Sequence, residues 1–485
     1  MTKAERIREL EAENAQQREQ IATLLRQSAE MQQRLTDLEA RLAKDSHNSS
    51  KPPASDGLKR PPPQTRSLRR RSGRTPGGQL GHRGETLHLV APAQVDAVVE
   101  HRPPVCATCQ ASLDATAVVT GRERRQVHEL PPTRLQVTEH QALQVRCAAC
   151  QQVTTALFPS RVASRAQYGP HLRAWVVYLV THQCVPYARV RDVLVEGYGV
   201  HLSLGTLVAW VRQAAQSLVP VETALKQALA HAPILHSDET GVRRAGRLVW
   251  AHVTSTPRLT HYAIHPKRGT AATDAIGILP GYTGVSVHDG WKPYQTYTGC
   301  RHALCNVHHL RELTFLEEQY QQTWATDLKA LLSEMRAAVE QARTHGQTQL
   351  PTAQHDAFVA RYEQTLAHGR AANPPHPPPE PRPHKRGRRK QSPARNLLER
   401  LSLGQRQVLA FLDDLTIPFD NNQAERDLRM LKVQQKISGG FRSDSGADTF
   451  ARLRGYVSTL RKQGGALLTA LESLFTDELL YPALA

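Results

Sequence analysis

The first stretch of the chain has apolar side chains at the spacing of a coiled coil. One set of heptad positions holds Ile7, Asn14, Ile21, Ser28, Leu35 and Leu42, and the other holds Leu10, Gln17, Leu24, Met31 and Leu38. Such a repeat buries a narrow seam against a partner helix. An asparagine in the seam favours a parallel dimer, because its side chain pairs with its own copy. We predict a coiled-coil dimerisation helix over residues 1–45; a solvated single helix is the alternative.

Residues 46–90 lose this periodicity and are rich in Ser, Pro, Gly and Arg. No acidic residue occurs over 57–84, where the positive side chains are Lys59, Arg60, Arg66, Arg69, Arg70, Arg71, Arg74 and Arg83. Such a segment repels itself and has little apolar surface to bury, so it predicts a disordered linker. On DNA it would release counterions and make binding depend on salt. We expect Arg69, Arg70 and Arg71 to bind DNA; a solvated linker is the alternative.

Residues 91–160 contain two Cys-x-x-Cys pairs. They are Cys106 with Cys109 and Cys147 with Cys150. Two such pairs complete a tetrahedral zinc site, and four thiolates leave no ligand position open for catalysis. The segment between the pairs alternates like strands. We predict a zinc ribbon with structural Zn²⁺; free thiols are the alternative.

Residues 165–225 have the pattern of several helices. The last two are separated by Tyr198, Gly199 and Val200, and Ser203 is placed to cap the second. The arrangement is that of a helix-turn-helix, whose second helix can enter a DNA major groove. A small helical bundle without DNA contacts is the alternative.

From residue 230 onward the pattern changes to strands mixed with helices. A short apolar strand precedes Asp238, two alternating segments meet at a turn around Pro257, and another buried strand precedes Asp289. A helix is predicted over 270–279. The pattern predicts an α/β core with a mixed sheet, in which Asp238 and Asp289 end neighbouring strands, where open α/β folds place ligands.

A helix farther along supplies a third acid, Glu425. Asn421 or Asn422 can cap this helix, and Gly439 or Gly440 can end it. Glu425, Arg429, Lys432 and Lys436 recur on one face at the helical period. We therefore expect the three basic side chains to hold DNA phosphates beside a metal-binding glutamate.

Composition extends this interpretation. The 485 residues include 62 Lys and Arg against 44 Asp and Glu, a net charge of +18, which favours a nucleic-acid partner. Length favours several folding units. No apolar run is long enough to span a membrane, and no secretory signal is present. We expect a cytoplasmic protein whose thiols stay reduced and therefore available to metal.

Three carboxylates can hold two Mg²⁺ or Mn²⁺ ions, because hard cations prefer carboxylate and water oxygens. A pair of such ions ~4 Å apart stabilises the attacking and leaving oxygens of phosphodiester transfer. Asp238, Asp289 and Glu425 are accordingly our candidates for the catalytic, metal-binding residues.

Five segments make a resemblance specific: SHNSSKPPASD, HSDETGVR, HDGWKPY, ALCNVHHLREL and NNQAERDLRMLKVQQKISGGFRS. In sequence and in order they resemble the insertion-sequence-66 family of bacterial transposases. The resemblance places the family's DDE acids on Asp238, Asp289 and Glu425. It implies a ribonuclease-H-like core, here over 230–435 with a mixed five-stranded sheet, whose last acid is delayed by a helical insertion. The sequence pattern places the insertion at about 315–410, and we predict a helical tail over 436–485.

One segment departs from the family pattern Cys-Trp-Ala-His-Ala-Arg-Arg. This chain has Cys305-Asn306-Val307-His308-His309-Leu310-Arg311, so asparagine stands at the tryptophan position. His308 is a candidate catalytic residue that touches the scissile phosphate or orients water; a structural histidine is the alternative. Cys305 and His308 have zinc-ligand spacing, but no further ligand follows at suitable spacing.

These observations predict a transposase that binds the terminal repeats of its own mobile element and cuts and joins DNA. We expect a homodimer or higher assembly, a bacterial, nucleoid-associated location and, by resemblance, accessory proteins of the same element. Two alternatives remain: a metal-dependent nuclease that does not join strands, and a non-enzymatic zinc regulator that binds DNA.

Overall fold

A computed structural model describes residues 3–45, 48–49, 81, 86–130, 133–375 and 391–484. It divides into two compact units: Arg66–Val137 forms one, and Met1–Thr65 with Thr138–Ala485 forms the other. The predicted DNA contacts Arg69, Arg70 and Arg71 lie outside the described residues. Within the described part, no helix is both long and apolar enough to cross a membrane.

The N-terminal elements are one long helix followed by sparse secondary structure. They are α1 (Lys3–Leu42), the 3-10 helix η2 (Pro92–Gln94), β1 (Gln144–Arg146) and β2 (Val153–Thr155). A helix therefore covers the predicted heptads. The strand pattern predicted between the cysteine pairs is wrong over most of its length, because among the described residues there only β1 is a strand.

The helical segment is well formed where the sequence predicted it. Its elements are α2 (Pro170–Val177), the π-helix η3 (Tyr178–His182), α3 (Tyr187–Tyr198), α4 (Leu204–Ser217) and α5 (Val219–Ala230). Gly199 ends α3 with φ of 64°, a conformation that costs glycine little. The Ser203 side chain accepts the Thr206 N–H at 3.0 Å, so the predicted turn and cap are confirmed.

A five-stranded mixed sheet lies at the centre of the core, as predicted. Its strands are β3 (Ile234–Arg244), β4 (Arg247–Ser255), β5 (Thr260–His265), β6 (Val285–His288) and β7 (Arg301–Leu304), and their order is β5-β4-β3-β6-β7. The first three pair antiparallel, whereas β3, β6 and β7 pair parallel. The links between strands contain α6 (Thr270–Ile276) and the 3-10 helices η4 (Leu279–Gly281) and η5 (Lys292–Thr296).

Strand β3 is longer than the sequence pattern indicated. It runs on to Arg244 because a tight turn at Ala245 and Gly246, with φ of 48° and 77°, folds β4 back along it. The parallel pairing with β6, by contrast, stops where His236 faces Val287. The prediction that Asp238 ends its strand is therefore wrong: Asp238 lies inside β3, just beyond the last parallel pair.

A helical insertion separates β7 from the helix that carries Glu425. It comprises α7 (Asn306–Tyr320), α8 (Thr323–Thr344), α9 (Thr352–Ala372), α10 (Pro393–Leu403), α11 (Gln405–Val408) and α12 (Ala410–Asp413). These helices bury large side chains, Trp324 and Tyr362 among them, in one cluster that reaches Val287 on β6. The insertion thus shares its apolar core with the sheet.

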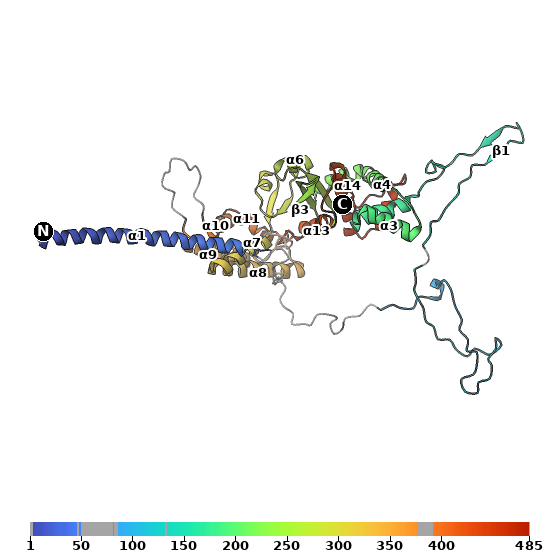
Figure 1. Cartoon of the computed structure of the whole chain (residues 1–485), viewed down its shortest axis with the longest axis horizontal. Helices are drawn as coiled ribbons and strands as arrows, with labels where there is room; N and C mark the ends of the chain where they lie inside the picture. Colours follow the sequence, from blue (N-terminus) through green and yellow to red (C-terminus); the bar gives the residue numbers. More distant parts are fainter. Residues whose placement is uncertain are drawn as a thin grey trace. The chain divides into compact units, whose positions relative to one another are not determined.

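The last helices are α13 (Asn422–Ser438), α14 (Asp444–Lys462) and α15 (Leu467–Ser473). Figure 1 shows α13 beside β3, whereas α14 packs against β5. Leu428 of α13 and Phe450 of α14 pack with Val253 of β4 in one cluster. The Thr459 hydroxyl also accepts the Thr260 N–H of β5 at 3.0 Å. Beyond α13 the chain therefore continues in the helices α14 and α15, and α14 covers a face of the sheet.

Candidate active site

Two aspartates meet where the parallel part of the sheet ends. Continuing the β3–β6 register beyond His236 and Val287 brings Asp238 beside Asp289. One oxygen of each carboxylate is held by a backbone N–H: Glu239 donates to Asp238 Oδ1 and Trp291 to Asp289 Oδ1, each at 2.8 Å. These bonds fix both carboxylates, and neither Oδ2 has a hydrogen-bond donor among the described residues.

The electrostatics of Asp238 depend on the charges of neighbouring acids. Burial raises the pKa of Asp238 well above its ordinary value, and the negative charge of Glu239 raises it further. The charges of Asp289 and Glu425 act in the same direction, although the bond from the Glu239 N–H opposes them. Neighbouring carboxylates that disfavour each other's ionisation are typical of sites that hold a cation or a shared proton.

Glu425 lies in the first turn of α13, and Asn421 holds that turn against the sheet. The Asn421 side chain does not cap the helix. Instead, its Nδ2 donates to the Ser237 carbonyl at 2.8 Å, and its Oδ1 lies 3.0 Å from His236 Nδ1. Asn421 was one of two residues predicted to cap this helix; in the structure its side chain forms hydrogen bonds with residues of β3 instead.

His308 lies beside Glu425. His308 Nε2 is 3.7 Å from Glu425 Oε1. Glu425 Oε1 and His308 Nδ1 are both buried and have no hydrogen-bond partner within the described residues. The structure thus brings together the four residues proposed as catalytic, and it leaves polar atoms among them that protein groups do not satisfy.

Two histidines that the sequence analysis missed orient the Asp289 loop. The Gly290 N–H donates to His288 Nδ1 at 3.0 Å, which puts the ring proton on Nε2. His288 Nε2 then donates to His302 Nδ1 at 3.0 Å, and His302 Nε2 to the Tyr297 carbonyl at 3.1 Å. Burial lowers the pKa of His288 to about 3, and His302 lowers it as well, so the chain of bonds stays neutral.

A fourth buried acid, Glu239, follows Asp238. Arg268 pairs with one of its oxygens at 2.6 Å, and the Tyr294 hydroxyl donates to the other at 2.5 Å. Arg268 itself lies 4.0 Å from the Trp291 ring and 4.9 Å from the Trp250 ring. The two adjacent acids in the sequence were a signal for this residue, but its partners come from distant segments.

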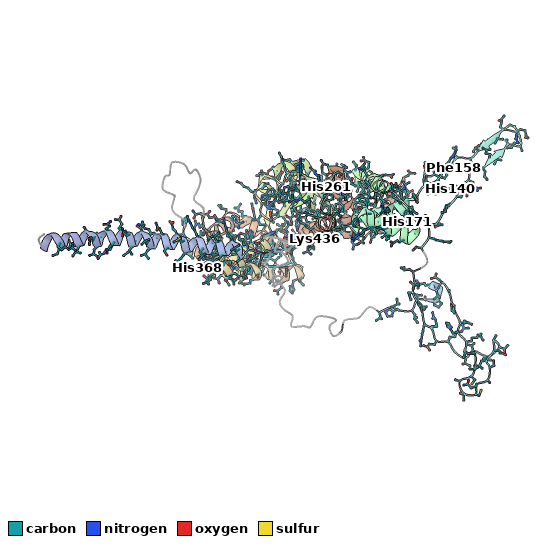
Figure 2. The ribbon with its side chains drawn as sticks, viewed as in Figure 1. His140, Phe158, His171, His261, His368 and Lys436 are labelled. Atoms are coloured by element: carbon teal, nitrogen blue, oxygen red, sulfur yellow. The ribbon has the colours of Figure 1, made fainter. Side chains whose placement is uncertain are left out.

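The three basic side chains on one face of α13 differ in their exposure and contacts. Arg429 and Lys436 are exposed, and Figure 2 labels Lys436. Lys432 is half-buried and its Nζ donates to the Gly241 carbonyl at 2.9 Å. Burial also lowers the pKa of Lys432. The ammonium of Lys432 therefore fastens α13 to β3, while the other two remain candidates for DNA phosphates.

Asn306, at the family's tryptophan position, is buried and takes part in a network of hydrogen bonds. Its Nδ2 donates to the Val408 carbonyl at 2.9 Å, and its Oδ1 lies 3.1 Å from His309 Nδ1. These contacts tie the start of α7 to the insertion. The substitution thus changes the packing beside the site and leaves His308 next to Glu425.

The two cysteine pairs lie in separate units, and each occupies the same type of turn. Gln110 and Gln151, which follow the pairs, have φ of 61° and 58°, and their N–H groups bond the Cys106 and Cys147 carbonyls at 2.9 Å. Backbone N–H groups within each turn, that of Cys109 or Cys150 first, lower the pKa of Cys106 and Cys147. Each turn therefore favours thiolates, the form that binds zinc.

The sequence model described as the Transposase IS66 family matches residues 165–449, more than half of the chain. The chain belongs to this family. Membership implies an enzyme that processes nucleic acid, binds DNA and uses divalent metal. All four candidate catalytic residues lie inside the match, whereas the paired cysteines lie outside it. A second model, for a family of unknown function, matches residues 2–88.

Two proteins of Sinorhizobium fredii (strain NBRC 101917 / NGR234) are similar to the chain. The uncharacterized protein y4jD is 23% identical over 394 residues, which cover 76% of this chain and 73% of that protein. The uncharacterized protein y4hP is 23% identical over 205 residues, which cover 39% of this chain and 37% of that protein.

Proposed function

We propose that this chain is a DNA transposase that cuts at the terminal repeats of its mobile element and joins the cut ends to target DNA. The observation that carries the proposal is the placement of Asp289 beside Asp238 by the β3–β6 register, with Glu425 near enough that its charge, like that of Asp289, raises the pKa of Asp238. Sheet order supports a ribonuclease-H-like core, because antiparallel β5, β4 and β3 are followed by parallel β6 and β7.

The donor set fits two hard divalent cations, Mg²⁺ or Mn²⁺. Asp238 and Asp289 each have one oxygen held by a backbone N–H, which leaves the second for a ligand. Glu425 Oε1 is buried without a hydrogen-bond partner. Carboxylate oxygens are the ligands that such cations prefer, and the positive charge of the cations would offset the repulsion among the acids. When bound, the cations would stabilise the attacking and leaving oxygens of phosphodiester transfer.

The protein's own groups hold the reacting parts in place. The backbone N–H groups of Glu239 and Trp291 orient the aspartates, and Asn421 holds the Glu425 helix against β3. His308 lies beside Glu425, where it can orient water or contact the scissile phosphate. Arg429 and Lys436 extend along α13 from Glu425 and are suited to the DNA backbone.

Other parts of the chain would bind and pair the DNA ends. The α3–α4 turn supports a helix-turn-helix, and the basic linker with Arg69, Arg70 and Arg71 suits phosphate contacts. The paired cysteines would hold structural Zn²⁺ in a ribbon, and α1 would form a coiled coil in a dimer. Accessory proteins of the element and a place on the bacterial nucleoid complete the proposal.

A cleavage and joining assay tests this function. Purified protein is incubated with labelled element ends, target DNA and Mg²⁺, and both cut and joined products are measured. Asp238→Asn, Asp289→Asn and Glu425→Gln should each abolish both products while end binding persists, because each removes a ligand charge without changing shape. Asp477→Asn, at an exposed acid, is the control and should keep full activity.

The products also separate the alternatives. Cut ends that never join would identify a nuclease, and end binding without any cutting would identify a regulator. Cleavage that survives all three neutral substitutions would show that the acids are assigned wrongly.

A further inference from the structure

A cysteine, a histidine and a glutamate meet at one point where two helices begin. Cys305 precedes α7, His308 lies in its first turn, and Glu425 lies in the first turn of α13. The Cys305 Sγ, a His308 ring nitrogen and a Glu425 oxygen all lie within 4.8 Å of one another. Sequence spacing suggested the first two as a ligand pair; the fold supplies the third ligand.

We propose that Cys305, His308 and Glu425 form a binding site for a transition-metal ion of the Zn²⁺ type, and that this site shares Glu425 with the proposed Mg²⁺ site. Zn²⁺ bound there would draw Glu425 away from Asp238 and Asp289 and so inhibit Mg²⁺-dependent cleavage. The binding site stands on its own geometry, and only the inhibition rests on the proposed function.

The distances suit a tetrahedral ion. Bonds of ~2.0–2.3 Å to zinc place ligand atoms roughly 3.3–3.8 Å from one another. His308 Nε2 and Glu425 Oε1 are already 3.7 Å apart, and the Cys305 sulfur lies within 4.8 Å of one His308 ring nitrogen and one Glu425 oxygen. A small rotation of the Cys305 side chain would bring the set to bonding distance, and water would take the fourth position.

One of the ligand atoms is buried with unmet bonding capacity. Glu425 Oε1 has no hydrogen-bond partner among the described residues. A buried carboxylate oxygen without a donor is costly, and a cation removes that cost. The buried acid Glu239, by contrast, is paired with Arg268.

Burial raises the pKa of the Cys305 thiol to about 12, so the free side chain keeps its proton, and backbone N–H groups of Asn421 and His308 only partly oppose that shift. The Asn421 N–H donates to Cys305 Sγ at 3.2 Å, and the sulfur lies at the positive end of α7. Binding would exchange the thiol proton for the metal: Cys305–SH and M²⁺ give the metal thiolate, and the proton leaves to solvent. No oxidant or reductant takes part.

The ligand types select the ion. Sulfur and imidazole nitrogen favour Zn²⁺ and Co²⁺, whereas Mg²⁺ prefers an all-oxygen shell. Cys305 and His308 therefore supply the softer ligand atoms of this site, and Glu425 supplies a hard oxygen ligand. Two classes of cation would compete for one carboxylate.

A cobalt titration of the full-length chain tests the site without reference to activity. Metal-free protein is titrated with Co²⁺, and the thiolate-to-cobalt charge-transfer absorption is recorded for wild type and Cys305→Ser. Contributions from the paired cysteines are common to both proteins and cancel in the difference. We expect the wild-type minus variant difference spectrum to contain a charge-transfer band equal to one thiolate per chain. Identical spectra of the two proteins would overturn the proposal.

Cys300→Ser is the matched control, because Cys300 is also buried but lies outside the ligand group. Its spectrum should equal that of wild type. If Cys305→Ser does not fold, His308→Ala replaces it and should weaken Co²⁺ binding at this site at least tenfold. Unchanged cobalt affinity in that variant would equally overturn the proposal.

A second arm tests the competition. With each protein measured relative to its own cleavage rate without Zn²⁺, Cys305→Ser should need at least tenfold more Zn²⁺ for half-inhibition than wild type. Equal Zn²⁺ sensitivity of the two proteins would refute the inhibition. If wild type shows the cobalt band but never cleaves DNA, the metal site stands and the proposed function fails.

Discussion

The side-chain amide of Asn421 donates to the Ser237 carbonyl at 2.8 Å, and this bond ties the helix that carries Glu425 to the strand that carries Asp238. The two residues are far apart in sequence and both are buried. The bond therefore ties the start of the Glu425 helix to the backbone next to Asp238, and we infer that Asn421 is a positioning residue.

Asn421→Ala should lower the free energy of unfolding by ~1–3 kcal/mol, because it leaves the buried Ser237 carbonyl and His236 without a partner. The variant should also need more Mg²⁺ for half-maximal cleavage, since Glu425 is held less firmly. Asn422→Ala, at the neighbouring partly exposed position, is the control for both measurements. A stability loss with unchanged Mg²⁺ dependence would reduce Asn421 to a structural role.

Acid should weaken the packing of α5 against the sheet. Burial alone would raise the pKa of Glu222, but hydrogen bonds and charges of His261 and Arg452 hold it at about 2. Figure 2 labels His261. A depressed folded-state pKa contributes stability that is present above the unfolded value near 4.5 and is lost as the pH falls toward 2.

Glu222→Gln should remove that contribution, about 2 kcal/mol at neutral pH, which is less than the full shift implies because the side chain keeps some contact with water. Urea unfolding at pH 7 and pH 3 measures it. The difference between wild type and variant should shrink at the lower pH, whereas Glu478→Gln, at an exposed acid, should change neither curve. A difference that does not depend on pH would contradict this assignment.

The sequence predicted elements whose signals are local. Heptads, the Gly199 turn and the Ser203 cap lie within short segments, and the structure has helices and a turn at those positions. Asp238 and Asp289 were also found together, since buried strands that precede acids are a local pattern. The extension of β3 was missed because it depends on antiparallel pairing with β4 through the Ala245–Gly246 turn.

What the sequence could not predict depends on side chains that meet across the fold. Asn421 is a residue type that often caps helices, yet its side-chain amide donates a hydrogen bond to the Ser237 carbonyl instead. The spacing of Lys432 places it on the basic face of α13, but in the structure its ammonium donates a hydrogen bond to the Gly241 carbonyl of β3. Glu425 joins Cys305 and His308 in the proposed ligand group only because the starts of α7 and α13 lie close together.

Zinc content tests the paired cysteines. The account predicts one tightly held Zn²⁺ per chain in addition to any exchangeable metal, and its complete loss in both Cys106→Ser and Cys147→Ser, because both turns would share one ion. Elemental analysis of dialysed protein measures it. Cys300→Ser should keep the ion, and a variant that retains zinc after either substitution would disprove a shared site.

Helix α1 should hold two chains together. Its seam residues Ile21 and Leu24 are 56% and 64% exposed in the single chain, so their apolar surface is uncovered without a partner. Leu24→Asp should convert the dimer to a monomer in sedimentation experiments, whereas Ala22→Asp, off the seam, should not. A wild-type chain that sediments as a monomer would remove the coiled coil from the account.

The central claim is that Asp238, Asp289 and Glu425 together hold two divalent cations. Crystals of the protein soaked in Mn²⁺ and measured at the manganese absorption edge test it most directly. The account predicts two anomalous peaks among the three carboxylates, both absent in Asp238→Asn. A soak at saturating Mn²⁺ that shows no peak there, or peaks only at other residues, would contradict it.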